Sequence, residues 1–370
     1  MEKTVQIVSF NVPYPPDYGG VMDVYYKIKS LKVLGYQIVL HTFHYGRPRS
    51  AFLESICSKV YYYPRRRKIQ DFFSSLPFIV KSRTNSELLK NLKNHNGLII
   101  LEGIHCTYPL WINALPDHRV FVRTHNVEYL YYEGLGIVEK NIFRKFYFYS
   151  ESKKLKEYEI SVLTNASHII CISPNDAAYF NEYFPNVSVI YPFHENDAVI
   201  SSVGKGKYIL IHADLSVPEN IYSINWLLEK VVSKIKFTVI IAGKNPDRKI
   251  QSFCGKYSHV KLFPNPTNEQ MNKLISEAQV LLIHSFYPQG MKLKLLNSLF
   301  KGRFVLVNSA VVQNTGLEEL CTIANTPEDY LIQIHQLMTA NFTNDHIRQR
   351  EVGLFPYLPQ TLAKKLIQLF

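Results

Sequence analysis

The sequence predicts an α/β protein with two doubly wound, Rossmann-like domains. Short apolar, often β-branched runs alternate with helical stretches along the whole chain of 370 residues. Strands that are apolar almost throughout are typical of parallel sheets covered by helices on both faces. The strand–helix series ends near residue 190 and starts again after residue 206, and each series has the length of one doubly wound domain.

The predicted strands also place the domain boundary. The first series reads TVQIVSFNV, QIVLHTF, KVYYYP, GLIILEG, RVFVRT, HIICIS and VSVIYP, and the second reads KYILIHA, KFTVIIAG, HVKLFP, AQVLLIHS and RFVLVN. The stretch between them is polar, contains Pro192 and two glycines, and breaks both periodicities. We therefore expect a first domain over residues 1–192 and a second over residues 193–353. A C-terminal helix over residues 354–370 is expected to cross back to the first domain.

The composition limits the class of protein and of partner. A hydrophobic content of 46% and a charged content of 19% are those of a globular chain, and the net charge of +12 favours anionic partners. No N-terminal signal is visible, and the longest apolar runs are far too short to span a bilayer. The cysteines are scattered without metal-ligand spacing, so we expect a cytoplasmic protein without a metal.

Two adjacent glycines follow the first predicted strand. Ligands of open α/β sheets bind beyond the carboxyl ends of the strands, so residues at these ends are candidates for a functional site. Gly19 and Gly20 precede a helix expected over Met22–Leu34. Glycines before a helix let backbone N–H groups approach an anion, which the helix dipole also favours. A plain turn has the same pattern, and the G-x-G-x-x-G pattern of dinucleotide-binding proteins is absent.

Polar side chains follow two later strands of the first series. RVFVRT is followed by His125, Asn126 and Glu128, and LIILEG is followed by His105. An imidazole, an amide and a carboxylate together can bind a polyhydroxy ligand or transfer a proton. A single histidine at a strand end is more often structural, so the three neighbouring groups indicate function more strongly than His105 does.

The second series has polar strand ends of its own. Asp214 follows YILIHA and is a candidate ligand residue or a loop and cap residue. Gly243 and Lys244 follow VIIA, where the glycine permits close backbone approach and the lysine can meet a phosphate. A surface turn would contain the same residues.

Residues 285–303, SFYPQGMKLKLLNSLFKGR, indicate an anion site. Gly290 precedes a predicted helix, and Lys292 and Lys294 lie in or near its first turn. Cations at a helix N-terminus oppose the dipole, and a bound phosphate would relieve that conflict. Asn297 lies one turn further along the helix.

Five segments in order resemble those of retaining glycosyltransferases with the GT-B fold, of the family-four type (glycosyl transferases group 1). They are PYPPDYGG with the following helix and strand, RTHNVEYLYYE, ASHIICISPNDAAYF, HADLSVPENIYSINWLLEKV and QGMKLKLLNSLFKGRFVLVN. RTHNVEYLYYE is similar to the HN-x-E segment of one bacterial branch. The resemblance covers nearly the whole chain and implies two domains that face each other across a cleft.

The resemblance also implies roles for individual residues. The second domain would hold a nucleotide-sugar donor and the first would bind a glycan or lipid-linked acceptor, with no metal or other cofactor. Lys294 matches the lysine at the donor diphosphate, Lys292 the basic residue two positions before it, and Gly19 and Gly20 the loop near the phosphates. His125 matches the histidine beside the transferred sugar. The implied protein is a hexosyltransferase of surface polysaccharide synthesis.

Two positions depart from the family pattern. Relatives often have glutamates eight residues apart, the second of which binds the donor ribose, whereas this chain has Gln289 and Asn297. Amides donate and accept hydrogen bonds, but a carboxylate accepts stronger, charge-assisted ones. Two alternatives therefore stay open: a catalytically degenerate GT-B protein that acts as a binding or assembly partner, and a sugar-nucleotide epimerase of the same fold.

Two segments of the first domain mix basic and large apolar residues. One contains Arg65, Arg66, Arg67 and Lys68, and the other spans residues 143–156. Such a mixture suits the surface of an anionic membrane and predicts peripheral association with the inner face of the cell membrane, although a solvated basic face over buried aromatics has the same pattern. No signature of a nucleic-acid-binding module is present, so nucleic acid is not an expected partner.

Overall fold

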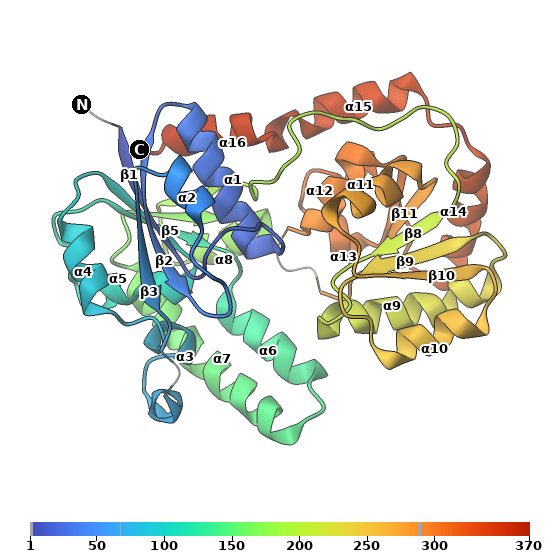
Figure 1. The fold of residues 1–370 in the computed structure, drawn as a ribbon. Helices are drawn as coiled ribbons and strands as arrows, with labels where there is room; N and C mark the ends of the chain where they lie inside the picture. Colours follow the sequence, from blue (N-terminus) through green and yellow to red (C-terminus); the bar gives the residue numbers. More distant parts are fainter. Residues whose placement is uncertain (1–2, 67, 288–290) are drawn as a thin grey trace. The chain divides into compact units, whose positions relative to one another are not determined.

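The protein divides into two compact units. The computed structural model describes residues 3–66, 68–287 and 291–370. Unit 1 comprises Met1–Glu195 and Pro359–Phe370, and unit 2 comprises Asn196–Leu358. The division therefore falls three residues after the expected boundary, and the C-terminal segment belongs to unit 1 from Pro359 onward. Figure 1 shows that each unit is a twisted sheet between layers of helices.

Unit 1 is built on a seven-stranded, entirely parallel sheet of order β3-β2-β1-β4-β5-β6-β7. Its strands are β1 (Thr4–Ser9), β2 (Gln37–His44), β3 (Lys59–Pro64), β4 (Leu98–Glu102), β5 (Val120–Thr124), β6 (His168–Cys171) and β7 (Val187–Val189). On β1, Ile7 lies between Leu40 of β2 and Ile100 of β4. Because all strands run the same way, the segments that follow them meet along one edge of the sheet.

Helices cover both faces of this sheet. They are α1 (Gly19–Val33), α2 (Ala51–Ile56), α3 (Phe78–Lys81), α4 (Ser86–Lys93), α5 (Tyr108–Trp111), α6 (Glu128–Val138), α7 (Ile142–Leu163), α8 (Pro174–Asn181) and α16 (Pro359–Ile367), with short 3-10 turns η1 (Ile69–Phe73) and η2 (Ile104–Cys106). Side chains of β1 alternate between two cores, with Val5 and Ile7 on the α1 face and Val8 on the α4–α7 face. In the first of these cores, α16 packs against α1.

Unit 2 repeats the plan with a six-stranded parallel sheet of order β10-β9-β8-β11-β12-β13. Its strands are β8 (Ile209–His212), β9 (Val239–Gly243), β10 (Val260–Pro264), β11 (Val280–Ile283), β12 (Phe304–Val307) and β13 (Thr322–Ile323). Its helices are α9 (Pro218–Lys230), α10 (Arg248–Lys256), α11 (Asn268–Glu277), α12 (Leu293–Lys301), α13 (Ser309–Val312), α14 (Pro327–Thr339) and α15 (Asn344–Leu354), with turns η3 (Val232–Lys234), η4 (Glu318–Leu320) and η5 (Phe355–Tyr357).

The predicted fold class, α/β with two parallel sheets, is confirmed, and the predicted start of the first helix is wrong. The helix expected from Met22 begins at Gly19, so the two glycines form its first turn and do not precede it. A Cβ on Gly20 would lie 2.6 Å from the ring of Phe10, which shows that this glycine makes room for an aromatic side chain. Among the described residues, no helix is both long and apolar enough to cross a membrane.

A buried network of four charges holds the carboxyl edge of the unit 1 sheet together. Arg123 of β5 donates two hydrogen bonds to Asp23 of α1, with Nε–Oδ2 and Nη2–Oδ1 distances of 2.6 and 2.8 Å. Lys27, one turn after Asp23, lies 2.6 Å from Oε1 of Glu102 at the end of β4 and 3.2 Å from Oδ2 of Asp23. All four side chains are almost completely buried.

The same network fixes the segment that leaves β7. Arg123 donates to the carbonyl oxygens of Ile190 and Tyr191 at 3.0 and 3.1 Å, and Asp23 accepts from the backbone N–H of Phe193 at 2.8 Å. Burial alone would raise the pKa of Asp23, but the charges of Arg123 and Lys27 outweigh it and hold that pKa well below its usual range. The carboxylate therefore stays ionised in the folded protein.

We predict that Asp23→Asn destabilises the protein strongly. Removing one carboxylate leaves a surplus positive charge in the interior, which typically costs about 3–5 kcal/mol. Urea unfolding followed by circular dichroism measures this loss. The matched control is Asp17→Asn, which breaks a more exposed ion pair with Arg47 and should cost at most about 1 kcal/mol. Equal costs for the two substitutions would contradict the structural role of the network.

Candidate functional site

The predicted lysines of unit 2 meet the first turn of α9. Lys292 lies immediately before α12 and its Nζ is 3.3 Å from Oε1 of Glu219, whereas Nζ of Lys294 donates to Oδ1 of Asn220 at 3.0 Å. Glu219 and Asn220 follow β8, and the lysines follow β11, its neighbour in the sheet. The structure thus brings two cations, a carboxylate and an amide together at the carboxyl edge, where ligands of such sheets bind.

Lys294 carries a charge that is only weakly compensated. Among the described residues no carboxylate lies within 4 Å of its Nζ. Burial and the neighbouring charge of Lys292 lower the pKa of Lys294 to about 8, with Glu219 opposing the shift. A bound anion would restore the favourable environment for the ammonium group. The local charge balance therefore suits a phosphate, as the sequence predicts.

Hydrogen bonds from the sheet fix α12 in place. Nε2 of His212, at the end of β8, lies 3.0 Å from Oγ of Ser298, and that hydroxyl donates to the carbonyl oxygen of Lys294 at 2.8 Å. Burial lowers the pKa of His212 to about 3, so the ring is neutral and can donate to Ser298. After β11, Oγ of Ser285 donates to Oε1 of Glu219 at 2.6 Å. The backbone around both lysines is thus positioned by buried contacts.

Asn297 faces a residue of its own unit. Its Oδ1 accepts from Nδ2 of Asn196 at 2.7 Å, so the oxygen that would receive a ribose hydroxyl is engaged by the first residue of unit 2. The ribose role that the resemblance implies for this position stays a prediction. Gln289 and Gly290 lie outside the described residues.

Local structure describes the positions of the other three predicted residues of unit 2, which are Asp214, Gly243 and Lys244. Asp214 accepts from the backbone N–H and the hydroxyl of Ser216 at 3.0 and 2.6 Å, which shapes the loop before α9. A Cβ on Gly243 would lie 1.9 Å from the carbonyl oxygen of Ala213, so only glycine fits there. The side chain of Lys244 is exposed, and its carbonyl oxygen accepts from the N–H of Leu215.

In unit 1, His125 lies at the rim of the buried charge network. Its Nε2 is 3.3 Å from Oε2 of Glu102 and 3.8 Å from Oδ2 of Asp23, and its side chain keeps 12% of its surface exposed. Phe10 packs edge-on against His125 and tilted against His105, with ring centroids 5.5 and 5.3 Å apart. The two predicted histidines therefore pack against the same aromatic ring at the carboxyl edge.

His105 and Glu128 are more enclosed than the sequence indicates. Burial, followed by the charge of Arg83, lowers the pKa of His105 well below its usual range, so its ring is neutral. Glu128 is 3% exposed, and burial raises its pKa to about 7. Its backbone N–H donates to Glu159 at 2.9 Å, which places Glu128 in the packing of α6 against α7. Asn126 is half-buried, and its side chain forms a hydrogen bond with the Glu128 carboxylate.

One group of residues has the geometry of a cation site. Ligand atoms of Asp23, Glu102 and His125 all lie within 4.8 Å of one another. Both carboxylates, however, already face Lys27 or Arg123 at 2.6 Å. A metal ion would have to displace these buried cations or share the carboxylates with them, so the donor set does not fit a resident metal.

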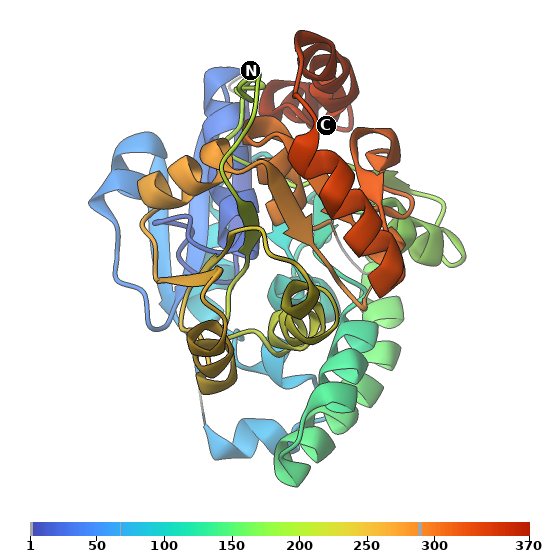
Figure 2. The ribbon, with the colours of Figure 1, turned by 90° about the vertical axis from the view of Figure 1, so that its right-hand side faces the viewer.

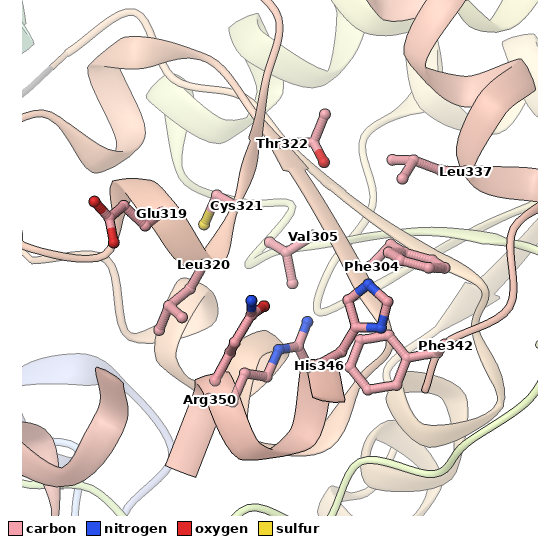
Figure 3. A pocket seen from close by; sticks show the side chains of 11 residues that line it. Phe304, Val305, Glu319, Leu320, Cys321, Thr322, Leu337, Phe342, His346 and Arg350 are labelled. Atoms are coloured by element: carbon pink, nitrogen blue, oxygen red, sulfur yellow. The ribbon is translucent and has the colours of Figure 1, made fainter. Parts of the chain in front are cut away.

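A cavity of about 230 Å³ lies elsewhere in unit 2 (Figure 3). It is lined around the first residues of β12 and around β13, among them Phe304, Cys321, Phe342, His346 and Arg350. Because Phe304 begins β12, the cavity lies at the amino edge of the sheet, away from Lys294. The guanidinium of Arg350 is occupied by carbonyl oxygens that include those of Leu299 and Gly302 at the end of α12. This arrangement indicates a structural role.

Several participants in these clusters, among them Glu102 and Arg123, are absent from the sequence prediction. Glu219 and Asn220 were visible only as a helix start after β8, and no motif marked Asp23 or Lys27. The spacing of Asp23 and Lys27, four residues apart, permits an ion pair on one helix. The bidentate partner of Asp23, Arg123, is 100 residues away in the chain, and Glu102, which pairs with Lys27, is 75 residues from it, so sequence spacing carries no signal for either contact.

Comparison with known proteins adds one relative. No protein-family model matches the chain. An uncharacterized 44.6 kDa protein in the cps region of Klebsiella pneumoniae is 25% identical over 341 residues, which span 86% of this chain and 87% of that protein.

Solved structures of glycosyltransferases resemble both units together. TarM of Staphylococcus aureus, in a complex that contains UDP, has a TM-score of 0.65 at 10% identity over 100% of this chain and 99% of that chain. The α,α-trehalose 6-phosphate synthase of Burkholderia multivorans scores 0.62 at 9% identity, over 100% and 98% of the two chains. HepE of Anabaena with UDP also scores 0.62, at 11% identity over 100% and 97%. At these identities the likeness concerns the fold, and the chain has the GT-B fold of these glycosyltransferases, as its sequence predicts.

Proposed function

We propose that the protein is a glycosyltransferase that moves a sugar from a nucleotide-sugar donor to a glycan or lipid-linked glycan acceptor in surface polysaccharide synthesis. The observation that carries the proposal is the pair Lys292 and Lys294 at the carboxyl edge of unit 2, in a chain with the GT-B fold. The complexes of TarM and HepE with UDP support a nucleotide-sugar donor, and the relative in the cps region supports the polysaccharide.

Stabilisation of the leaving diphosphate is the central step of the proposed mechanism. Breaking the bond between sugar and phosphate builds negative charge on the diphosphate, which Lys292, Lys294 and the N-terminal end of α12 can stabilise without reorganisation. The acceptor oxygen then attacks from the same face, a diphosphate oxygen takes its proton, and the configuration is retained. Asp23 and Glu102 form ion pairs with the buried side chains of Arg123 and Lys27, so neither carboxylate serves as a nucleophile. His125 would orient the sugar.

We predict that Lys294→Met weakens UDP binding about tenfold to a hundredfold, because a charge-assisted hydrogen bond to the diphosphate is lost. Isothermal titration calorimetry measures the affinity. The matched control is Lys249→Met, which removes an exposed lysine paired with Glu229 in the same unit and should leave binding unchanged.

The role of Lys294 also predicts the direction in which UDP affinity changes with pH. With a pKa of about 8, Lys294 is largely protonated at pH 7, and a bound diphosphate would raise that pKa. Affinity should therefore be highest below pH 8 and fall as the pH rises through 8, with proton uptake visible between buffers of different ionisation enthalpy. Both effects should vanish in Lys294→Met. An unchanged affinity in this variant would remove the diphosphate role.

Transfer is proposed to need no metal, because the two lysines would neutralise the leaving group and the group formed by Asp23, Glu102 and His125 is already paired with cations. We predict that sugar transfer keeps its rate in an excess of EDTA after dialysis against chelator. Loss of activity that returns with Mg²⁺ or Mn²⁺ would contradict this expectation.

A second candidate function is a binding or assembly protein that has lost turnover. Its support is Asn297, whose amide oxygen is engaged by Asn196 where relatives would present a carboxylate. Glu219 does supply a carboxylate beside Lys292, which favours the enzyme. Product analysis separates the possibilities: an enzyme transfers or hydrolyses a UDP-sugar that it binds, an epimerase converts it, and a binding protein returns it unchanged.

An exposed apolar tip supports the proposed location at a membrane surface. It comprises Ile137, Ile142, Phe143 and Phe146 around the turn between α6 and α7, and the two phenylalanines are 82% and 75% exposed. Figures 1 and 2 show that this hairpin extends beyond the sheet of unit 1. Such side chains can enter the headgroup region while basic neighbours, among them Arg144, meet anionic lipids.

The 3-10 turn η1 continues this surface along α7. Phe72 packs edge-on against Tyr147 at 5.7 Å, and its carbonyl oxygen accepts from Lys154 at 3.1 Å, while the neighbouring Phe73 is 85% exposed. Of the basic run before η1, Arg66 and Lys68 are exposed and Arg67 lies outside the described residues. Arg65 is half-buried, so it contributes less to the surface than the sequence indicates.

We predict that Phe143→Ser with Phe146→Ser reduces binding to vesicles containing phosphatidylglycerol by about tenfold or more, because the inserted apolar area is lost. Vesicle co-sedimentation measures the bound fraction. The matched control is Ile332→Ser with Phe355→Ser, two exposed apolar residues of unit 2. Absence of vesicle binding by the unchanged protein would overturn the proposed location.

A further inference from the structure

Unit 1 contains a buried guanidinium without an acidic partner. Arg83, two residues after α3, is 3% exposed, and among the described residues no carboxylate lies within 4 Å of it. Its Nε and Nη1 donate to the carbonyl oxygens of Phe10 and Ile79 at 3.0 and 2.7 Å. Nη2 has no partner within the described part of the chain. Arg123, by contrast, places Nη2 on both a carboxylate and a carbonyl oxygen. Burying a cation without a carboxylate partner costs free energy, and an anion bound at Arg83 would recover part of that cost.

A second arginine lies beside it on the same aromatic ring. The guanidinium carbon of Arg65 is 4.4 Å from the ring centroid of Tyr45, and that of Arg83 is 5.9 Å from the same centroid. Nε of Arg65 donates to Oγ of Ser82, the residue before Arg83. Burial, and after it the charge of Arg65, lower the pKa of Arg83 to about 10. The charge of Arg65 adds to that of Arg83, so an anion at this point would be attracted by both.

This pair lies where the sheet offers a ligand site. Arg65, Tyr45 and Phe10 each directly follow the strands β3, β2 and β1, which are neighbours in the sheet. His105 and His125 follow β4 and β5, next in the same order. Because all five strands are parallel, these residues line one carboxyl edge, with the arginines at one end and His125 at the other.

We propose that Arg83 and Arg65 form a subsite for a phosphate or diphosphate group on the acceptor. The planar fork of arginine matches phosphate oxygens in a bidentate arrangement, and Nη2 of Arg83 is available for it. The inference rests on the proposed function, in which unit 1 binds the acceptor. It narrows the acceptor class to a glycan or lipid that carries a phosphate group and excludes a neutral sugar as the natural acceptor.

Pyrophosphate binding tests the subsite in the full-length chain. The background variant is Lys294→Met, which weakens the donor-side anion site about tenfold or more, so that one tight pyrophosphate site is expected by calorimetry. Arg65→Gln in this background should weaken that site about tenfold or more, and Arg83→Lys should weaken it while keeping the buried charge. The matched control is Arg49→Gln, an exposed arginine that stacks on Tyr62 outside the cluster and should change the affinity less than twofold.

The melting temperature and the circular dichroism spectrum of each variant show whether it is folded. Arg65 is half-buried, so Arg65→Gln should fold normally and decides the matter even if Arg83→Lys is unstable. Unchanged pyrophosphate affinity in folded Arg65→Gln would overturn the proposal, as would an equal loss in Arg49→Gln.

Two further arms distinguish the source of the phosphate. Methyl diphosphate in solution represents a free sugar diphosphate, and dodecyl diphosphate in neutral phosphatidylcholine vesicles represents a lipid-linked group. If binding of either probe weakens in Arg65→Gln, the subsite is supported and that probe identifies the source of the phosphate. If binding of neither probe depends on Arg65, the proposal is overturned. UDP binding by Arg65→Gln in the chain that keeps Lys294 is measured in parallel. If UDP fails to bind the unchanged protein while pyrophosphate still depends on Arg65, the proposed function fails and the anion subsite stands.

Discussion

The bidentate pair of Arg123 and Asp23 is the interaction on which the carboxyl edge of unit 1 depends. It joins the first helix to the fifth strand and also holds the backbone at Ile190, Tyr191 and Phe193, where the chain leaves β7. Lys27 and Glu102 extend it to β4. Because the four charges balance, the interior tolerates them, and because each is held by several groups, the loops that follow β4 and β5 have defined positions. His125 can therefore be placed at the rim of a rigid edge.

Buried charges in this protein differ in how fully the surrounding groups satisfy them. Arg123 faces a carboxylate and two carbonyl oxygens, and Arg350 is surrounded by carbonyl oxygens at the end of α12, so both are satisfied within the fold. Burial lowers the pKa of Arg350 to about 9, as it lowers those of Lys294 and Arg83, so the difference lies in the hydrogen-bond donors that stay unused. Among the described residues, Lys294 donates to one amide oxygen and Nη2 of Arg83 donates to none. An anion that binds either group recovers part of the desolvation cost already present in the unbound protein, which favours tight binding at these two places.

The sequence reveals the fold more completely than the site, for a physical reason. Apolar strands and intervening helices are local patterns, and from them follow two parallel sheets and functional residues at strand ends. Lys292 and Lys294 were found because a cation at a helix start conflicts with the dipole within one turn. The roles of Gly243 and Gly20 were not found, since they depend on the Ala213 carbonyl and the Phe10 ring, which only the folded chain brings close. Arg83 likewise gives no local signal, because the absence of a partner is a property of the tertiary structure.

The asparagine at position 297 can be understood from the residues around it. A glutamate there would bring a carboxylate beside Asn196, whose amide could still donate to it, so the packing alone does not demand an amide. The cluster already contains Glu219, which pairs with Lys292 and accepts from Ser285. A second carboxylate one turn from Lys294 would compensate that lysine and weaken its attraction for a diphosphate. With an amide at 297, Glu219 can accept a hydrogen bond from a hydroxyl or from Lys292. The charge of Lys294 then remains unpaired with a carboxylate and can attract an anion. The departure from the family pattern is therefore compatible with a working donor site, in which the acidic partner comes from the start of α9.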